Sequence, residues 1–188
     1  FNTVDYILVA YGLNDFFSEV PVYPEYYYDI NSYVGALRNG ILHLREHYPQ
    51  AQIVLVTPTY SQLFESEREY RIGDYVEAMR GVSVEMNTGL ADMFHIMGDD
   101  AASRISHLDD GVHLSAEGRE IYAQGINWYL TEKQNSRHNS RTYGKCIYRV
   151  KFIEDTVSGI FVSYIARMPL LLGIYGFSLS KAKLCIII

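Results

Sequence analysis

Cysteine is scarce in this chain of 188 residues, and its two cysteines, Cys146 and Cys185, stand near the C-terminal end. Residues 1–133 therefore contain no disulfide framework, and a packed core must stabilise them instead. The composition suits such a core, because 48% of the residues are hydrophobic and 14% are aromatic. Internal repeats and low-complexity tracts are missing as well. The sequence thus predicts a globular protein, while the cysteine count leaves its cellular compartment unknown.

Basic residues are few in the first part of the chain. Residues 1–133 contain 8 Lys and Arg against 20 Asp and Glu, a net charge of −12, whereas residues 134–188 contain 8 against 2, a net charge of +6. Phosphate contacts need a basic surface, so the acidic part argues against nucleic acid as a partner. The change in charge divides the chain into a body (residues 1–133) and a basic, apolar tail (residues 134–188) whose structure the sequence does not indicate.

Strand and helix patterns alternate along the body. The nearly continuous apolar run Asp5–Tyr11 is typical of a strand buried on both faces, as in a parallel sheet. Apolar residues at three- and four-residue steps from Ile30 to Tyr48 predict a helix that ends before Pro49. Similar patterns predict a strand at 51–57, a helix at 74–87, a strand at 89–97 and a helix at about 115–130, capped by Ser115. This order indicates βαβ units and a three-layer α/β sandwich.

Two polar segments, far apart in the sequence, interrupt these apolar patterns. Gly12-Leu13-Asn14-Asp15 follows the first predicted strand, and Asp110-Gly111-Val112-His113 precedes the last predicted helix. An imidazole that takes a proton from a nucleophile needs a carboxylate to fix its tautomer, and the resulting oxyanion needs a hydrogen-bond donor. His113, Asp110 and Asn14 are of the types that meet these needs. The two segments therefore predict parts of one hydrolytic site.

A nucleophile is missing from these motifs, since neither Gly-Asp-Ser nor Gly-x-Ser-x-Gly occurs among the 188 residues. The two segments nevertheless resemble the third and fifth sequence blocks of the SGNH (GDSL-type) esterase and lipase family, and the similarity covers roughly residues 3–131. In that family the serine belongs to a first block at the end of the first strand, and a glycine of the second block completes the oxyanion hole. Both would precede Phe1, so we infer that the domain is N-terminally truncated.

The resemblance implies a flavodoxin-like, three-layer α/β/α sandwich with a parallel sheet whose first strands are missing. It also implies a serine esterase or lipase that cleaves an acyl or acetyl ester of a lipid or carbohydrate, without a metal or cofactor. His113 is then the general base and acid, Asp110 orients it, and Asn14 donates to the oxyanion. Gly12 and Asp15 support the loop that presents the asparagine. Without the serine, this chain alone is expected to have little or no esterase activity.

Three other interpretations stay open. The chain is a non-catalytic pseudoenzyme or binding module if it retains only half of the site. It is membrane-attached if Val157–Phe177 contacts a bilayer, although Arg167 within that segment costs roughly 2.5–3.5 kcal/mol on insertion scales. It is a zinc hydrolase if the H-x-x-E-H pattern from His43 to His47 binds metal. That pattern occupies the last turn of its helix, where polar and cationic side chains commonly interact with the helix dipole, so zinc is disfavoured.

Three local questions remain at this stage. Asp109 competes with Asp110 as the orienting acid, and the spacing of the family favours Asp110. The tyrosines at positions 23, 26, 27 and 28 either contact a substrate or pack a helix start. A missing first strand would leave residues 4–11 with an unpaired edge, and we expect the alternating residues near 145–152 to cover it partly.

Overall fold

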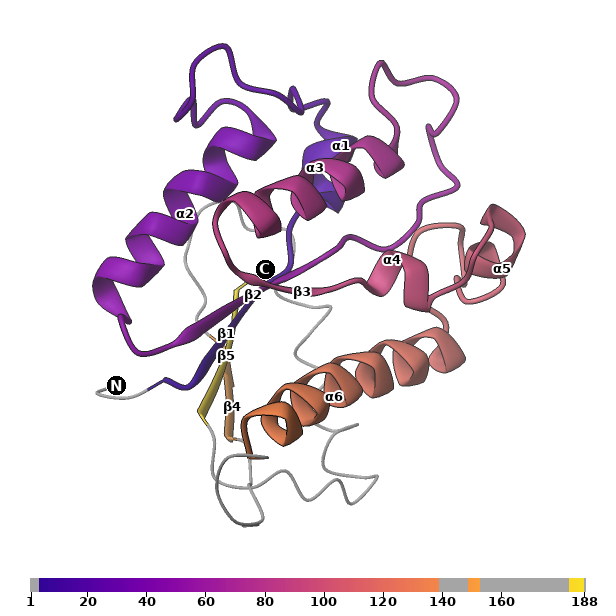
Figure 1. Cartoon of the computed structure of the whole chain (residues 1–188). Helices are drawn as coiled ribbons and strands as arrows, with labels where there is room; N and C mark the ends of the chain where they lie inside the picture. Colours follow the sequence, from indigo (N-terminus) through magenta and orange to yellow (C-terminus); the bar gives the residue numbers. More distant parts are fainter. Residues whose placement is uncertain (1–3, 139–148, 153–182, 188) are drawn as a thin grey trace.

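The computed structural model describes residues 4–138, 149–152 and 183–187, and its elements are labelled in Figure 1. In chain order they are β1 (Tyr6–Val9), α1 (Leu13–Phe17), α2 (Tyr33–His47), β2 (Gln52–Val56), α3 (Ile72–Glu85), β3 (Gly89–Ala91), α4 (Met93–Ile96), α5 (Ala101–Ile105), α6 (Ala116–His138), β4 (Arg149–Phe152) and β5 (Lys183–Ile187). The predicted alternation of strands and helices in the body is confirmed.

The strands form a five-stranded sheet in the order β3-β2-β1-β5-β4, and every neighbouring pair in it is parallel. β1 lies in the middle, where Ile7 is opposite Ile53 of β2 on one side and Cys185 of β5 on the other. All four residues of β1 are at most 5% exposed. This is the burial that the continuous apolar run predicts for a strand covered on both faces.

Alternate residues of β1 point to opposite faces of the sheet, and helices cover both faces (Figure 1). Ile7 and Val9 belong to a hydrophobic cluster that includes residues of α2 and α3. Tyr6 and Leu8 belong to a second cluster that includes Tyr129 and Leu130 of α6. The molecule is therefore a three-layer α/β/α sandwich, as the sequence predicts.

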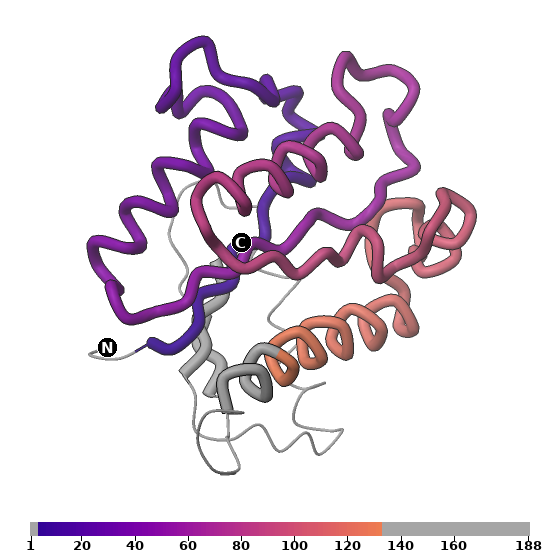
Figure 2. Tube along the Cα trace, viewed as in Figure 1, coloured from indigo at the N-terminus to yellow at the C-terminus, as the bar shows by residue number. Residues whose placement is uncertain are grey.

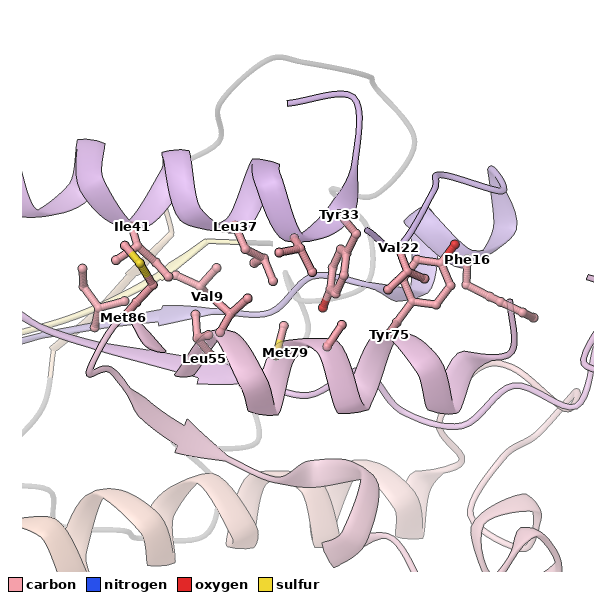
Figure 3. Packing of buried hydrophobic residues seen from close by; sticks show 14 of the residues in the cluster. Val9, Phe16, Val22, Tyr33, Leu37, Ile41, Leu55, Tyr75, Met79 and Met86 are labelled. Atoms are coloured by element: carbon pink, nitrogen blue, oxygen red, sulfur yellow. The ribbon is translucent and has the colours of Figure 1, made fainter. Parts of the chain in front are cut away.

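The larger cluster fills the space between the sheet and helices α2 and α3 (Figure 3). Leu37 and Ile41 of α2 and Met79 of α3 pack with Val9 and Leu55 of the sheet, and none of the five is more than 5% exposed. Burial of a side chain of this size contributes about 1.5–3 kcal/mol. This layer fixes β1 and β2 against their helices, and with them the loops that follow the two strands.

The predicted strand at 89–97 is wrong beyond Ala91. Asp92 ends β3 and caps α4, because its Oδ1 accepts a hydrogen bond from the His95 amide at 3.2 Å. Its Oδ2 accepts two further hydrogen bonds from the Arg80 guanidinium, at 3.0 and 2.6 Å. A carboxylate that accepts from the amide three residues ahead starts a helix, so the apolar residues after Asp92 form a helical turn.

The tail contributes two strands, and the later one pairs with β1. β5 lies directly beside β1, whereas β4, within the predicted strand at 145–152, lies one position further out. The expectation that 145–152 covers the edge of β1 is therefore wrong, and residues 183–187 cover that edge instead. The uninterrupted run Leu184–Ile187 suits an interior strand, and the alternation of charged and apolar residues in β4 suits an edge.

The rest of the tail bears on two predictions. Val157–Phe177, the segment with a predicted bilayer contact, lies outside the described residues. Among the helices that the structure does describe, none is long and apolar enough to cross a membrane. The division of the chain at residue 133 stays a prediction, and α6 continues across it to His138.

Candidate active site

Gly12 makes the turn between β1 and α1 and is the N-cap of α1. Its φ of 122° lies in the region that favours glycine. A Cβ at this position would lie 2.9 Å from the Tyr33 hydroxyl and 3.0 Å from the Pro58 ring. Glycine is therefore required here both by conformation and by space.

Asn14 follows two residues later and is exposed. Its side-chain amide makes no hydrogen bond to any residue that the structure describes. The backbone around it is held, because the carbonyls of Gly12 and Asn14 accept from the amides of Phe16 and Ser18, both at 2.9 Å. The fixed backbone thus holds the side-chain amide of Asn14 at the carboxyl end of β1. Ligands bind at this end of the strands in parallel α/β folds.

Asp15 is partly buried beneath this turn. Burial raises the pKa of its carboxyl, against hydrogen bonds from the backbone amides of Asp15 and Gly12 that lower it. The bond from the N-cap amide to the carboxylate of the third helical residue is one half of a capping box. The Asp15 carbonyl also accepts from the Val20 amide at 2.9 Å. These contacts place Asp15 against the turn, as the predicted supporting role requires.

Asp110 and His113 are in direct contact. The His113 ring Nδ1–H donates to Asp110 Oδ2 at 2.6 Å, and Oδ1 accepts from the backbone amides of His113 and Val112 at 2.7 and 3.0 Å. These bonds, led by the one from the His113 amide, lower the pKa of Asp110 to about 2. With Nδ1 as the donor, the lone pair of the imidazole is on Nε2. Asp109 contacts His113 only through its backbone amide, which donates to the His113 carbonyl at 2.8 Å.

The loop that carries this pair (the His113 loop, residues 107–115) is closed by local hydrogen bonds. The Ser115 amide donates to the His107 carbonyl at 2.9 Å, and Leu108 and Leu114 form an antiparallel bridge. Ser115 also starts α6, since its Oγ accepts from the Gly118 amide at 3.0 Å, which confirms the predicted cap. A Cβ on Gly118 would lie 2.2 Å from the His107 carbonyl oxygen. Glycine there lets the first turn of α6 approach the loop.

The segment between β2 and α3 (the β2–α3 connection, residues 57–71) can be followed in Figure 2. It contacts both the His113 loop and α1, the helix that contains Asn14. On one side the Gln62 amide donates to the Gly111 carbonyl at 2.7 Å. On the other side Arg68 donates to the Phe17 carbonyl of α1 at 3.2 Å, and the rings of Phe64 and Phe17 pack edge to face with centroids 6.1 Å apart. The His113 loop and α1, the helix that contains Asn14, are thus attached to one connection.

The β2–α3 connection also presents apolar surface. Leu63 is 46% exposed and Phe64 is 43% exposed. Phe64 has a φ of 62°, which for a bulky residue costs roughly 1–3 kcal/mol. The Phe17 ring and the Arg68 guanidinium, 4.9 Å from the centroid of the Phe64 ring, hold it in this conformation. Sequence reasoning missed this connection, because Gln62 acts through its backbone and Arg68 binds a backbone carbonyl, and neither belongs to a motif.

The tyrosine cluster lies on the connection between α1 and α2. Tyr23, Tyr26, Tyr27 and Tyr28 are 47–64% exposed. Tyr27 donates to the Glu85 carboxylate at the end of α3, and its ring lies 3.9 Å from the Arg38 guanidinium of α2. Tyr27 therefore packs against helices, which favours the structural interpretation for this member of the cluster.

The sequence itself decides the family. Residues 2–121 match the model of the GDSL-like lipase/acylhydrolase family. The chain belongs to this family. The predicted resemblance to SGNH hydrolases is thereby confirmed, and the matched range contains the Asn14 turn and the Asp110–His113 pair.

Curated relatives agree with this membership. The chain is 27% identical over 128 residues to the human isoamyl acetate-hydrolyzing esterase 1 homolog, which covers 60% of this chain and 50% of that protein. It is 25% identical over 143 residues to the homolog from Mus musculus, covering 69% and 57%. The chain thus spans about half the length of the curated relatives that it matches.

Solved structures share the fold. A protein from Lactobacillus plantarum superposes with a TM-score of 0.61 at 18% identity, over 70% of this chain and 68% of that one. A catalytic mutant of an acetylxylan esterase from Geobacillus stearothermophilus superposes with a TM-score of 0.52 at 20% identity, over 67% and 59%. GDSL family membership and the three-layer α/β/α fold therefore agree.

Proposed function

We propose that this GDSL family chain carries the acid–base pair and one oxyanion donor of a serine ester hydrolase. The observation that carries the proposal is the Asp110–His113 pair, in which the carboxylate binds ring Nδ1 at 2.6 Å and leaves Nε2 as the base. Asn14 contributes the donor. Its exposed amide lies on the turn after β1, and the β2–α3 connection ties that turn and the His113 loop to a common support.

The chemistry follows from these roles. His113 Nε2 accepts the proton of a serine hydroxyl as the serine oxygen attacks the ester carbonyl carbon, and Asn14 donates to the oxyanion that forms. The intermediate then expels the alcohol oxygen, which takes the proton from the His113 imidazolium, and an acyl-serine remains. Water repeats both steps and releases the acid. One oxyanion donor is typically worth about 2.7–4 kcal/mol of transition-state stabilisation.

For the substrate we propose an acetyl or other short acyl ester of a lipid or carbohydrate. The exposed apolar pair Leu63 and Phe64 supports this class, because it gives an apolar surface on the same connection that binds the His113 loop through Gly111. Two relatives are named for acetate esters, one for isoamyl acetate and one for acetylxylan. The ester is bound and cleaved, in this proposal, without a metal or organic cofactor.

The serine of the proposed reaction belongs to a Gly-Asp-Ser block that the 188 residues do not contain. We therefore propose that chain 1–188 alone has little or no esterase activity, because removing the nucleophile from a site whose residues act as a unit removes nearly all covalent catalysis. The test is release of nitrophenol from a short-chain nitrophenyl ester by purified chain 1–188 and its His113→Ala variant. Hydrolysis that His113→Ala abolishes would show that a nucleophile is present and that the proposed inactivity is wrong.

A second candidate function, a non-catalytic binding module, is favoured by the same lack of a serine block. The two candidates differ when a strand followed by Gly-Asp-Ser is joined ahead of Phe1, as in other members of the family. A hydrolase then gains activity that depends on His113 and on Asn14. A binding module stays inactive with the serine supplied, provided that circular dichroism shows the longer chain to be folded.

A further inference from the structure

We propose that the last turn of α2 binds a divalent transition-metal ion, Zn²⁺ for example, through His43, Glu46 and His47. Each of these residues offers a ligand atom, and the three atoms lie within 4.8 Å of one another. All three side chains are exposed, so an ion reaches them from solvent. This inference does not depend on the proposed ester hydrolysis.

The spacing explains the grouping. Residues three and four positions apart in an α-helix lie on one face, so His43 is beside Glu46 and His47. The two imidazole rings have their centroids 4.2 Å apart with an interplanar angle of 42°. Two imidazoles and a carboxylate are the ligand set of several zinc sites, with water in the fourth position of a tetrahedron. The ion would thus keep one position open to solvent.

A backbone hydrogen bond prepares one of the histidines. His47 Nδ1 lies 2.9 Å from the carbonyl oxygen of His43, so Nδ1–H donates to that carbonyl and the lone pair is on Nε2. A metal-ligating histidine usually donates its other ring N–H to such an acceptor, which fixes both its tautomer and its orientation. His47 has this arrangement within its own helix, before any ion is bound.

The electrostatics of the helix end also favour a cation. The turn lies at the C-terminus of the 15-residue helix α2, where the helix dipole is negative and the last carbonyls lack helical partners. Glu46 adds a full negative charge. The nearest cation in the sequence, Arg45, is engaged elsewhere, because its guanidinium donates to the carbonyls of Met86 and Asn87 after α3.

The position separates this group from the candidate active site. The end of α2 leads into Gln52, the first residue of β2, and so lies at the amino edge of the parallel sheet. Asn14 follows the carboxyl end of β1, at the opposite edge. A metal bound there would therefore be separate from ester hydrolysis. The sequence alone disfavours zinc at this helix end, and the grouping of three exposed ligand atoms, which spacing alone does not show, is the ground for proposing it.

Calorimetric titration of chelator-treated chain 1–188 with Zn²⁺ tests the proposal. We expect one equivalent to bind, and we expect His43→Ala and His47→Ala each to lose that binding. Glu46→Gln should weaken it, since the amide keeps the shape and loses the charge. His95→Ala is the matched control: His95 is also exposed and lies 3.5 Å from Asp99, four residues on, without a second imidazole. It should bind Zn²⁺ like the unchanged chain.

A second measurement excludes the thiols of the tail. Co²⁺ gives a weak visible spectrum with nitrogen and oxygen ligands and an intense near-ultraviolet band with thiolates, so the spectrum of the Co²⁺-loaded chain identifies the ligands. A spectrum without the thiolate band, retained in the Cys146→Ser/Cys185→Ser chain and lost in His47→Ala, supports the proposal. Failure to bind Zn²⁺, or binding that only the cysteine substitutions remove, overturns it.

Discussion

The two parts of the candidate site are held in different ways. The turn that presents Asn14 is held by packing in the hydrophobic core. Gly12 is enclosed by Tyr33 and Pro58, and the Phe16 side chain of α1 is fully buried. The His113 loop is held mainly by hydrogen bonds within itself, together with one from the Gln62 amide, and its Asp110 and His113 side chains are about half exposed, at 55% and 47%. The proposed oxyanion donor is thus positioned by tertiary packing, whereas the proposed acid–base pair is positioned mainly by its own loop. Substitutions in one part should therefore leave the other largely unchanged.

The largest difference between the two parts is expected in the loss of stability when a buried side chain of each is truncated to alanine. Phe16→Ala should destabilise the protein by about 3–5 kcal/mol, because it empties a site where the Phe16 ring packs edge to face with Tyr75, centroids 6.2 Å apart. Val112→Ala, in the His113 loop, should cost only about 1.5 kcal/mol for two methyl groups. Urea unfolding of both variants measures these values. Equal losses would show that the loop is as deeply packed as the turn.

The NMR signal of the His113 ring tests whether the two parts of the site are independent. If the two parts are independent, the Nδ1–H resonance of His113 keeps its chemical shift in folded Phe16→Ala, because the bond to Asp110 is made within the loop. Loss of that resonance while the protein is folded would mean that the packing beneath Asn14 also orders the acid–base pair.

The glycines of the two parts give a smaller contrast. Gly12→Ala should cost about 1–3 kcal/mol, because alanine is strained at a φ of 122° and its Cβ meets the Tyr33 hydroxyl and the Pro58 ring. Gly111 has a φ of 83°, where strain alone costs about 1–2 kcal/mol, and its Cβ would meet only the flexible Gln62 side chain, at 3.1 Å. Gly12→Ala should therefore have a lower melting temperature than Gly111→Ala in thermal unfolding. The reverse order would indicate that Gln62 cannot move.

Much of this fold is predictable from hydrophobic periodicity, and its exceptions have identifiable causes. β1 and β2 are recognisable because both faces are buried, which leaves a continuous apolar run. β3 is shorter than predicted because Asp92 binds the His95 amide and Arg80, neither of which periodicity reveals. β5 was not predicted, because a short apolar segment far along the chain gives no indication of the strand with which it pairs.

The candidate site divides in the same way. The contact between Asp110 and His113 is local, three residues apart, so the spacing known from the family is enough to select Asp110 over Asp109. The link between the His113 loop and the Asn14 turn is not local. It depends on the backbone amide of Gln62 and the backbone carbonyl of Phe17. Every residue has such a carbonyl and every residue except proline has such an amide, so the sequence cannot single them out.

The smallest expected effect is the acid dependence of Asp110. Its pKa is lowered from 3.8 to about 2 in the folded state, so ionised Asp110 favours folding above pH 3.8, and this contribution is lost as the pH falls toward 2. The Asp110→Asn variant has no carboxylate to protonate at this position. Its free energy of unfolding should therefore fall less steeply than that of the unchanged chain over this interval. Asp109→Asn is the control, because the Asp109 carboxylate accepts no hydrogen bond from the described residues. Melting temperatures between pH 2 and 4 should therefore follow the unchanged chain for Asp109→Asn and diverge for Asp110→Asn. If the melting temperatures of both variants diverge equally from those of the unchanged chain, the acid dependence arises from any carboxylate near the loop. The specific bond between Asp110 and His113 is then not its cause.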